Sequence, residues 1–207
     1  QNAVIGTTLG ALAGIVLGNN VGGGNEGRNK VVGAIAGAAV GGAIGYSMDK
    51  QAKEVAESLN TNVNNNPTAA LDPNQDLIVS NTDNYVKIMF RDDMMFETNS
   101  ANPTYSAGTK ISKITSVLQK YPNTLVQVVG HTDSRGSYEY NLNLSEKRAT
   151  NVGNIINSTG VQNQIFSRGC SFNKPVALNN SDSNMGLNRR VEVYLYPNQQ
   201  SVIDVCK

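Results

Sequence analysis

The order of apolar and polar positions from residue 76 onward predicts five short strands. A half-buried strand alternates apolar and polar residues, and a fully buried strand is a short apolar run bounded by turn signals. By these criteria the predicted strands are 76–80, 84–90, 125–129, 165–170 and 190–196. The turn formers Asn81–Asn84 join the first two strands as a hairpin.

Two helices are predicted between these strands. Apolar residues recur at helical spacing over 105–120 and over 137–158, and Ser137 is a suitable N-cap for the second helix. Residues 96–101 are predicted as a strand end and turn, and 179–188, rich in turn formers, as a loop. The resulting βαβαβ order with a closing strand predicts an α+β fold, a two-layer sandwich with a mixed sheet.

The first 50 residues carry glycine at every fourth position instead. The glycines lie in two apolar segments, 3–18 and 31–46, which a polar stretch over 19–30 separates. Each glycine costs a helix about 1 kcal/mol relative to alanine, whereas a small-xxx-small row lets helices pack closely in a membrane. We therefore predict a glycine-zipper helical hairpin over 1–50, membrane-embedded or self-associating. A Gly/Ala-rich soluble hairpin and a flexible leader are the alternatives. The glycines in register are Gly6, Gly10, Gly14, Gly18 and Gly22, then Gly33, Gly37, Gly41 and Gly45.

The length of the apolar segments bears on the kind of membrane. A helix of about 16 residues measures about 24 Å, less than the ~30 Å core of a typical bilayer. A thinner bilayer, such as the bacterial outer membrane, reduces the mismatch. No signal-peptide pattern is visible at Gln1, so we expect a mature or trimmed chain.

Composition shifts divide the remainder of the chain. Alternating charges over 49–60 predict a helical extension leaving the membrane, and the polar, proline-containing stretch 61–73 predicts a linker. The predicted domains are thus a hairpin, an extension with linker, a globular domain and a C-terminal tail. Their bounds are 1–50, 51–75, 76–197 and 198–207.

Charge and the scarcity of reactive side chains exclude several functions. The net charge is +1 and no basic stripe is visible, so we expect no nucleic-acid partner. One histidine, His131, and two distant cysteines are too few soft ligands for a zinc site. No acid pair or nucleophile–base pair indicates an enzyme, and we expect neither catalysis nor a cofactor. Cys170 and Cys206 are either unrelated small residues or one disulfide that ties the tail to the domain in an oxidising compartment.

One acid and one base have suitable positions for binding a ligand. Asp133 ends the third predicted strand, and Arg148 lies two to three turns into the next helix, on the same helix face as Asn141. A carboxylate can accept from an ammonium while a guanidinium holds a carboxylate, so the pair suits a zwitterion. Arg189 and Arg190 should point to opposite faces of the last strand, so one of them can face the site. A structural ion pair between Asp133 and Arg148 is the alternative.

Three segments, VVGHTDSRGSYEYNLNLSEKRA, FSRG…KPV and NRRVEVYL, closely resemble the OmpA-like C-terminal domain. The resemblance spans residues 76–197, and the family includes the peptidoglycan-associated lipoproteins. It implies non-covalent binding of peptidoglycan through the diaminopimelate of the stem peptide. The ligand-binding positions that it implies are Asp133, Arg148, Asn141, Arg189, Thr132, Thr98 and Asn99. Glu97 replaces the aspartate that is usual in the family's loop.

A glycine zipper followed by this domain is similar to small outer-membrane lipoproteins. We therefore predict a wall tether, with the hairpin in the outer membrane, the domain in the periplasm, and peptidoglycan and outer-membrane lipid as partners. The alternative is a structural subunit of an oligomeric envelope complex that the zipper assembles, through copies of this chain or other envelope proteins. A stator-like module of an ion-driven motor is disfavoured because neither apolar segment contains an acid.

Overall fold

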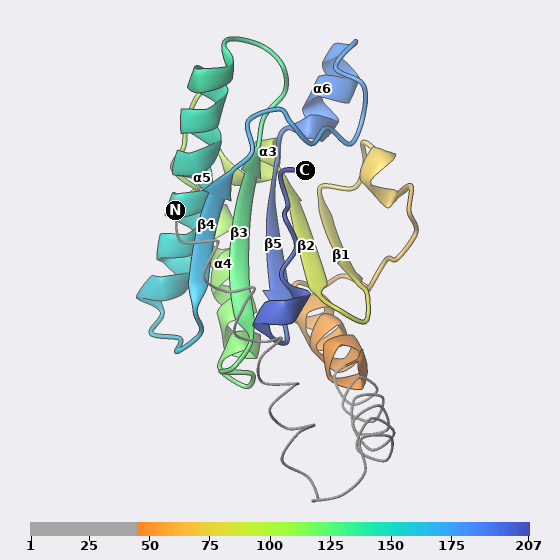
Figure 1. Cartoon of the computed structure of the whole chain (residues 1–207), viewed down its shortest axis with the longest axis vertical. Helices are drawn as coiled ribbons and strands as arrows, with labels where there is room; N and C mark the ends of the chain where they lie inside the picture. Colours follow the sequence, from red (N-terminus) through yellow and green to blue (C-terminus); the bar gives the residue numbers. More distant parts are fainter. Residues whose placement is uncertain (1–44) are drawn as a thin grey trace, which may run out of the picture.

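The computed structural model describes residues 45–207 (Figure 1). The predicted glycine-zipper hairpin therefore lies almost wholly outside the described residues. Residues 45–58 are helical. The elements that follow are η2 (Ala69–Leu71), β1 (Leu77–Asn81), β2 (Val86–Arg91), α3 (Asp92–Met95), α4 (Tyr105–Leu118), β3 (Leu125–His131), α5 (Tyr138–Ser158), β4 (Ile165–Gly169), α6 (Asp182–Asn188), β5 (Arg190–Tyr196) and η3 (Gln199–Ser201). Over residues 45–207, no helix has both the length and the hydropathy to cross a membrane.

The five strands form one mixed sheet in the order β1-β2-β5-β3-β4. All neighbours are antiparallel except β3 and β4, which are parallel. Helices α4 and α5 cover one face, and their apolar side chains pack there against Val126, Val191 and Val193. The predicted two-layer α+β fold is confirmed, and the five strands and two helices predicted over 76–197 are present with ends shifted by two residues or fewer.

The prediction of a loop over 179–188 is wrong for residues 182–188, which form α6. The Ser181 hydroxyl caps this helix by accepting a hydrogen bond from the Asn184 N–H at 3.2 Å. At the other end of the helix, Leu187 and Asn188 are buried. An N-cap typically contributes about 1 kcal/mol. Capping and burial therefore outweigh the turn-forming composition of this segment.

The charged segment 49–60 is helical through residue 58, but it packs onto the domain instead of projecting from it. The buried apolar residues over 45–60 belong to the main hydrophobic core; they are Met48, Ala52, Val55, Ala56 and Leu59. The Gln51 amide donates to the Thr124 hydroxyl at 3.0 Å. Glu54 accepts from Lys120 at 2.9 Å and from Tyr121 at 3.0 Å. The folded core thus begins well before residue 76, where the sequence predicted the domain to start.

Replacing Val55 by alanine should lower the free energy of unfolding by about 2 kcal/mol, because two buried methyl groups are lost and a small cavity remains. Val55 is fully buried. The matched control is Glu57→Ala on the exposed side of the same helix, which should change stability by less than about 0.5 kcal/mol. Urea unfolding of both variants measures the difference. Equal stability of the two variants would show that this helix does not pack on the domain.

The other face of the sheet is covered by the C-terminal tail, which runs along the sheet in Figure 1. Val205 packs there in a cluster with Leu125, Val129 and Tyr196. Cys206 forms a disulfide with Cys170 at a Cα–Cα distance of 5.1 Å. The sequence left open whether these cysteines are unrelated or form one disulfide, and the structure shows the disulfide.

Candidate ligand-binding site

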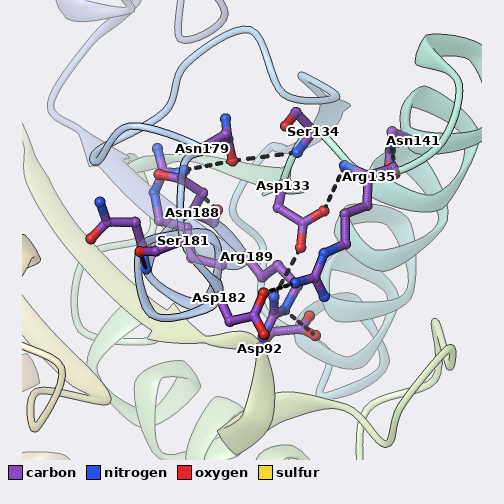
Figure 2. A network of polar contacts seen from close by, with 12 residues as sticks. Asp92, Asp133, Ser134, Arg135, Asn141, Asn179, Ser181, Asp182, Asn188 and Arg189 are labelled. Atoms are coloured by element: carbon purple, nitrogen blue, oxygen red, sulfur yellow. Dashed lines mark hydrogen bonds and ion pairs between the residues drawn. The ribbon is translucent and has the colours of Figure 1, made fainter.

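Three strand ends bring charged residues together at one edge of the sheet. In the strand register, Arg190 at the start of β5 lies opposite Arg91 at the end of β2 and His131 at the end of β3. Asp92 directly follows β2, Asp133 lies two positions after the end of β3, and Arg189 directly precedes β5. They meet in the network of polar contacts shown in Figure 2.

Arg189 lies between the two carboxylates. Its Nη1 is 2.9 Å from Asp133 Oδ2, and its Nε is 3.9 Å from Asp92 Oδ2. The other oxygen of Asp133 accepts from the Arg135 N–H at 2.9 Å, which fixes the carboxylate against the loop after β3. The side chain of Arg189 is 28% exposed, against 8% for Asp133. Of these two partners, the guanidinium is therefore the more accessible to a ligand.

Arg148 reaches the same network from α5. Its Nη1 lies 2.7 Å from Asp92 Oδ1, and its Nη2 donates to Asp92 Oδ2 at 3.2 Å. Its Nε donates to the Ser100 carbonyl at 3.0 Å, and the guanidinium lies 4.7 Å from the centre of the Phe96 ring. Among the described residues, Arg148 is paired with Asp92, and Asp133 is paired with Arg189. The alternative of a direct structural pair between Asp133 and Arg148 is not what the structure shows.

Asn141 and Thr132 lie beside this network and are both buried. Asn141 Nδ2 donates to the carbonyls of Arg135 at 2.7 Å and Ser137 at 3.2 Å, so it holds the loop that carries Asp133. The Thr132 N–H donates to the Ser171 carbonyl at 2.9 Å, whereas its buried hydroxyl has no partner in the structure. Asn141 is therefore a positioning residue for the loop.

Thr98 and Asn99 are exposed on the turn that follows Phe96. Asn99 has a φ of 59°, a left-handed conformation that asparagine tolerates better than most residues. The same turn supplies the Ser100 carbonyl to Arg148. The structure therefore places this turn against Arg148, with the two predicted residues facing solvent.

Sequence reasoning missed Asp92, which contacts both arginines. The available signal was its position directly after β2, because β2 and β5 are antiparallel neighbours and the end of one meets the start of the other. It also missed the exposed pair formed by Arg135 and Asp182 at the rim of the network (Figure 2).

The Asp92–Arg148 pair is buried at a net cost. Burial raises the pKa of Asp92, although the charges of Arg148 and Arg189 oppose this. Burial likewise lowers the pKa of Arg148, against the attraction of Asp92. Both shifts favour the neutral forms, so desolvation outweighs the mutual attraction of the charges. A pair with these properties adds little to stability and is a candidate for a functional role.

Arg190 points to the opposite face, as predicted, and pairs there with a buried acid. Its Nε donates to Glu192 Oε1 at 2.8 Å. Burial by itself would raise the pKa of Glu192, but the Arg190 charge holds it well below its usual value. His131 Nε2 lies 3.4 Å from Glu192, and burial lowers the pKa of His131 although the Glu192 carboxylate opposes this. Within residues 45–207, no group of three or more His, Cys, Asp or Glu side chains is placed to hold a metal.

Two family models match parts of this chain. Residues 95–189 match the model of the OmpA family, and residues 5–52 match the glycine-zipper model. The chain therefore resembles an OmpA-family domain over 95–189 and a glycine-zipper segment over 5–52. This confirms the resemblance inferred from the sequence.

Among relatives, the probable lipoprotein YiaD of Escherichia coli K12 is 34% identical over 103 residues, which are 49% of this chain and 47% of YiaD. The peptidoglycan-associated lipoprotein of Buchnera aphidicola is 34% identical over 96 residues, 46% of this chain and 54% of the relative. The chain thus spans about half the length of these two relatives. The cell wall anchor of the T6SS from Pseudomonas aeruginosa matches in structure with a TM-score of 0.54 and 27% identity, over 64% of this chain and 97% of the anchor.

Proposed function

We propose that this protein binds peptidoglycan non-covalently through the diaminopimelate of a stem peptide and so tethers the outer membrane to the cell wall. The observation that carries the proposal is the meeting of two carboxylates and two guanidiniums at one edge of the sheet. These four charges sum to zero and suit a ligand end that carries one ammonium and one carboxylate. The relatives named as peptidoglycan-associated lipoprotein and cell wall anchor support it.

Each pole of the zwitterion has a partner in this arrangement. Asp133 accepts hydrogen bonds from the ammonium, and the guanidiniums of Arg189 and Arg148 hold the carboxylate. A hydrogen bond to a charged group contributes about 1.5–3 kcal/mol net of water, so a single site would bind with an affinity on the order of micromolar to millimolar. Because the wall is a polymer, many membrane-anchored copies would hold it by avidity.

The position of the site in the domain also supports a tether. The strand ends that carry Asp92, Asp133 and Arg189 lie at the opposite end of the sheet from the helical residues 45–58 (Figure 1). Those residues continue directly from the glycine-zipper segment along the chain. We infer that the zipper faces the membrane while the site faces the wall.

The test is co-sedimentation of the full chain, in detergent, with sacculi whose stem peptides contain diaminopimelate. We expect saturable retention that free meso-diaminopimelate reverses and that lysine, at equal concentration, reverses much less. Retention no greater than that of an unrelated protein would contradict the proposal. The alternative of an envelope-complex subunit instead predicts a defined oligomer or co-purifying proteins by native mass measurement.

A further inference from the structure

Asp92 is the acid of this site that the proposed function leaves without a role. One of its oxygens lies 2.7 Å from Arg148 Nη1, and the other lies 3.2 Å from Arg148 Nη2 and 3.9 Å from Arg189 Nε. A single internal carboxylate therefore faces both of the guanidiniums that would hold the ligand's carboxylate. Asp92 is buried, so its charge acts with little screening by water.

We propose that Asp92 sets the charge selectivity of the site, so that a ligand must present an ammonium together with its carboxylate. The inference rests on the proposed function and names a residue that determines its ligand class. With Asp92 present, the two acids balance Arg148 and Arg189, and a carboxylate without an ammonium meets no net positive charge. Without the Asp92 charge, Asp133 is the one acid that balances Arg148 and Arg189. The site then has a net positive charge, and a ligand with a carboxylate but no ammonium is no longer disfavoured.

The energetics of the site agree with such a role. Burial raises the pKa of Asp92 despite two neighbouring cations, so keeping its charge there opposes stability. Two groups besides Asp92 also position Arg148. The Ser100 carbonyl and the Phe96 ring also contact its guanidinium. The backbone N–H of Asp92 donates to the Arg189 carbonyl at 3.1 Å, and a side-chain substitution leaves that bond intact.

The test compares two ligands of the same length on three proteins. Calorimetric titration of the full chain with meso-diaminopimelate and with pimelate, which lacks both amino groups, gives an affinity ratio for each protein. The variants are Asp92→Asn and, as matched control, Asp93→Asn at the exposed neighbouring position. We expect Asp92→Asn to lower the preference for diaminopimelate about tenfold, the effect of one charge-assisted contact. Asp93→Asn should leave the preference within about twofold of wild type.

The outcomes separate this inference from the proposed function. If wild type binds diaminopimelate and the ratio in Asp92→Asn equals that in Asp93→Asn, the role of Asp92 is refuted and the proposed function stands. If wild type binds neither ligand, the proposed function fails and the inference fails with it. Thermal unfolding verifies that the variants fold. Asp92→Ser removes the same charge with a smaller side chain and carries the same expectation if the asparagine variant does not fold.

Discussion

Replacing Asp133 by asparagine should abolish retention of the protein on sacculi while the domain stays folded. The substitution keeps the shape of the side chain but removes the charge that would accept the ligand's ammonium. Removing one partner of a buried, hydrogen-bonded charge pair costs about 2–5 kcal/mol of binding. At about 1.4 kcal/mol per tenfold change, this cost lowers the affinity roughly 30-fold to several thousand-fold. A site of micromolar to millimolar affinity would then no longer retain the protein on sacculi.

The variant should fold because Arg189, which loses its ion pair with Asp133, is accessible to water. The side chain of Arg189 is 28% exposed and can be solvated when its ion pair is lost. The matched control is Asp182→Asn at the rim, where the carboxylate is 93% exposed and, within residues 45–207, forms an ion pair only with Arg135. This variant should keep most of the retention, because an exposed pair contributes little. Retention of Asp133→Asn at the wild-type level would remove Asp133 from the site.

The largest loss of stability is expected from Arg190→Met, at about 3–5 kcal/mol. Glu192 is buried on the tail-covered face of the sheet, and Arg190 is its cation at 2.8 Å. The remaining contacts are weaker partners, because burial lowers the pKa of His131 and so opposes its charged form, and the Tyr194 hydroxyl only donates a hydrogen bond, at 2.8 Å. The methionine variant therefore leaves a buried carboxylate without a counter-ion. Chemical denaturation at pH 7 measures the loss.

The double variant Arg190→Met/Glu192→Met is the control for this prediction. It removes both charges and should recover most of the lost stability, since an apolar replacement of a buried ion pair is often nearly neutral. A double variant as unstable as Arg190→Met would show that Arg190 acts through packing or its backbone contacts and not through Glu192.

The pH dependence of the loss gives a second, independent check. In wild type the pKa of Glu192 lies below its unfolded value, so its stabilisation is present above that value and is lost as the pH falls through the folded pKa. In Arg190→Met, burial without the cation raises the same pKa, so the cost is present at neutral pH and is relieved on acidification. The difference in unfolding free energy between the two proteins should therefore shrink as the pH is lowered from 7. A difference independent of pH would contradict the assignment.

Local signals in the sequence were enough to predict most of the fold. Strand β5 appears where its alternation places it, and α5 begins after the predicted cap Ser137, whose hydroxyl accepts from the Tyr140 N–H at 3.1 Å. Two segments were misjudged because their stabilising contacts are distant in sequence. The charged helix that ends at residue 58 packs its apolar face against the domain. The hydrogen bond from Gln51 to Thr124, 73 positions away, is one of the contacts that hold it there. Helix α6 depends on the burial of Leu187.

The sequence by itself identified three of the four charged residues of the candidate site, because residue types and strand ends follow from local order. It placed Asp133 after β3, Arg148 and Asn141 on one helix, and Arg189 before β5. The tertiary structure alone decided which charges meet. Asp92 and Arg148 are 56 positions apart, as are Asp133 and Arg189. The pairing of β3 with β5 brings Asp133 to Arg189, whereas the packing of α5 on the sheet brings Arg148 to Asp92 at the end of β2. The periodicity of the sequence specifies which face of a helix or strand a side chain lies on. The residue with which a charged side chain pairs depends on the order and register of the strands, and long-range packing sets both.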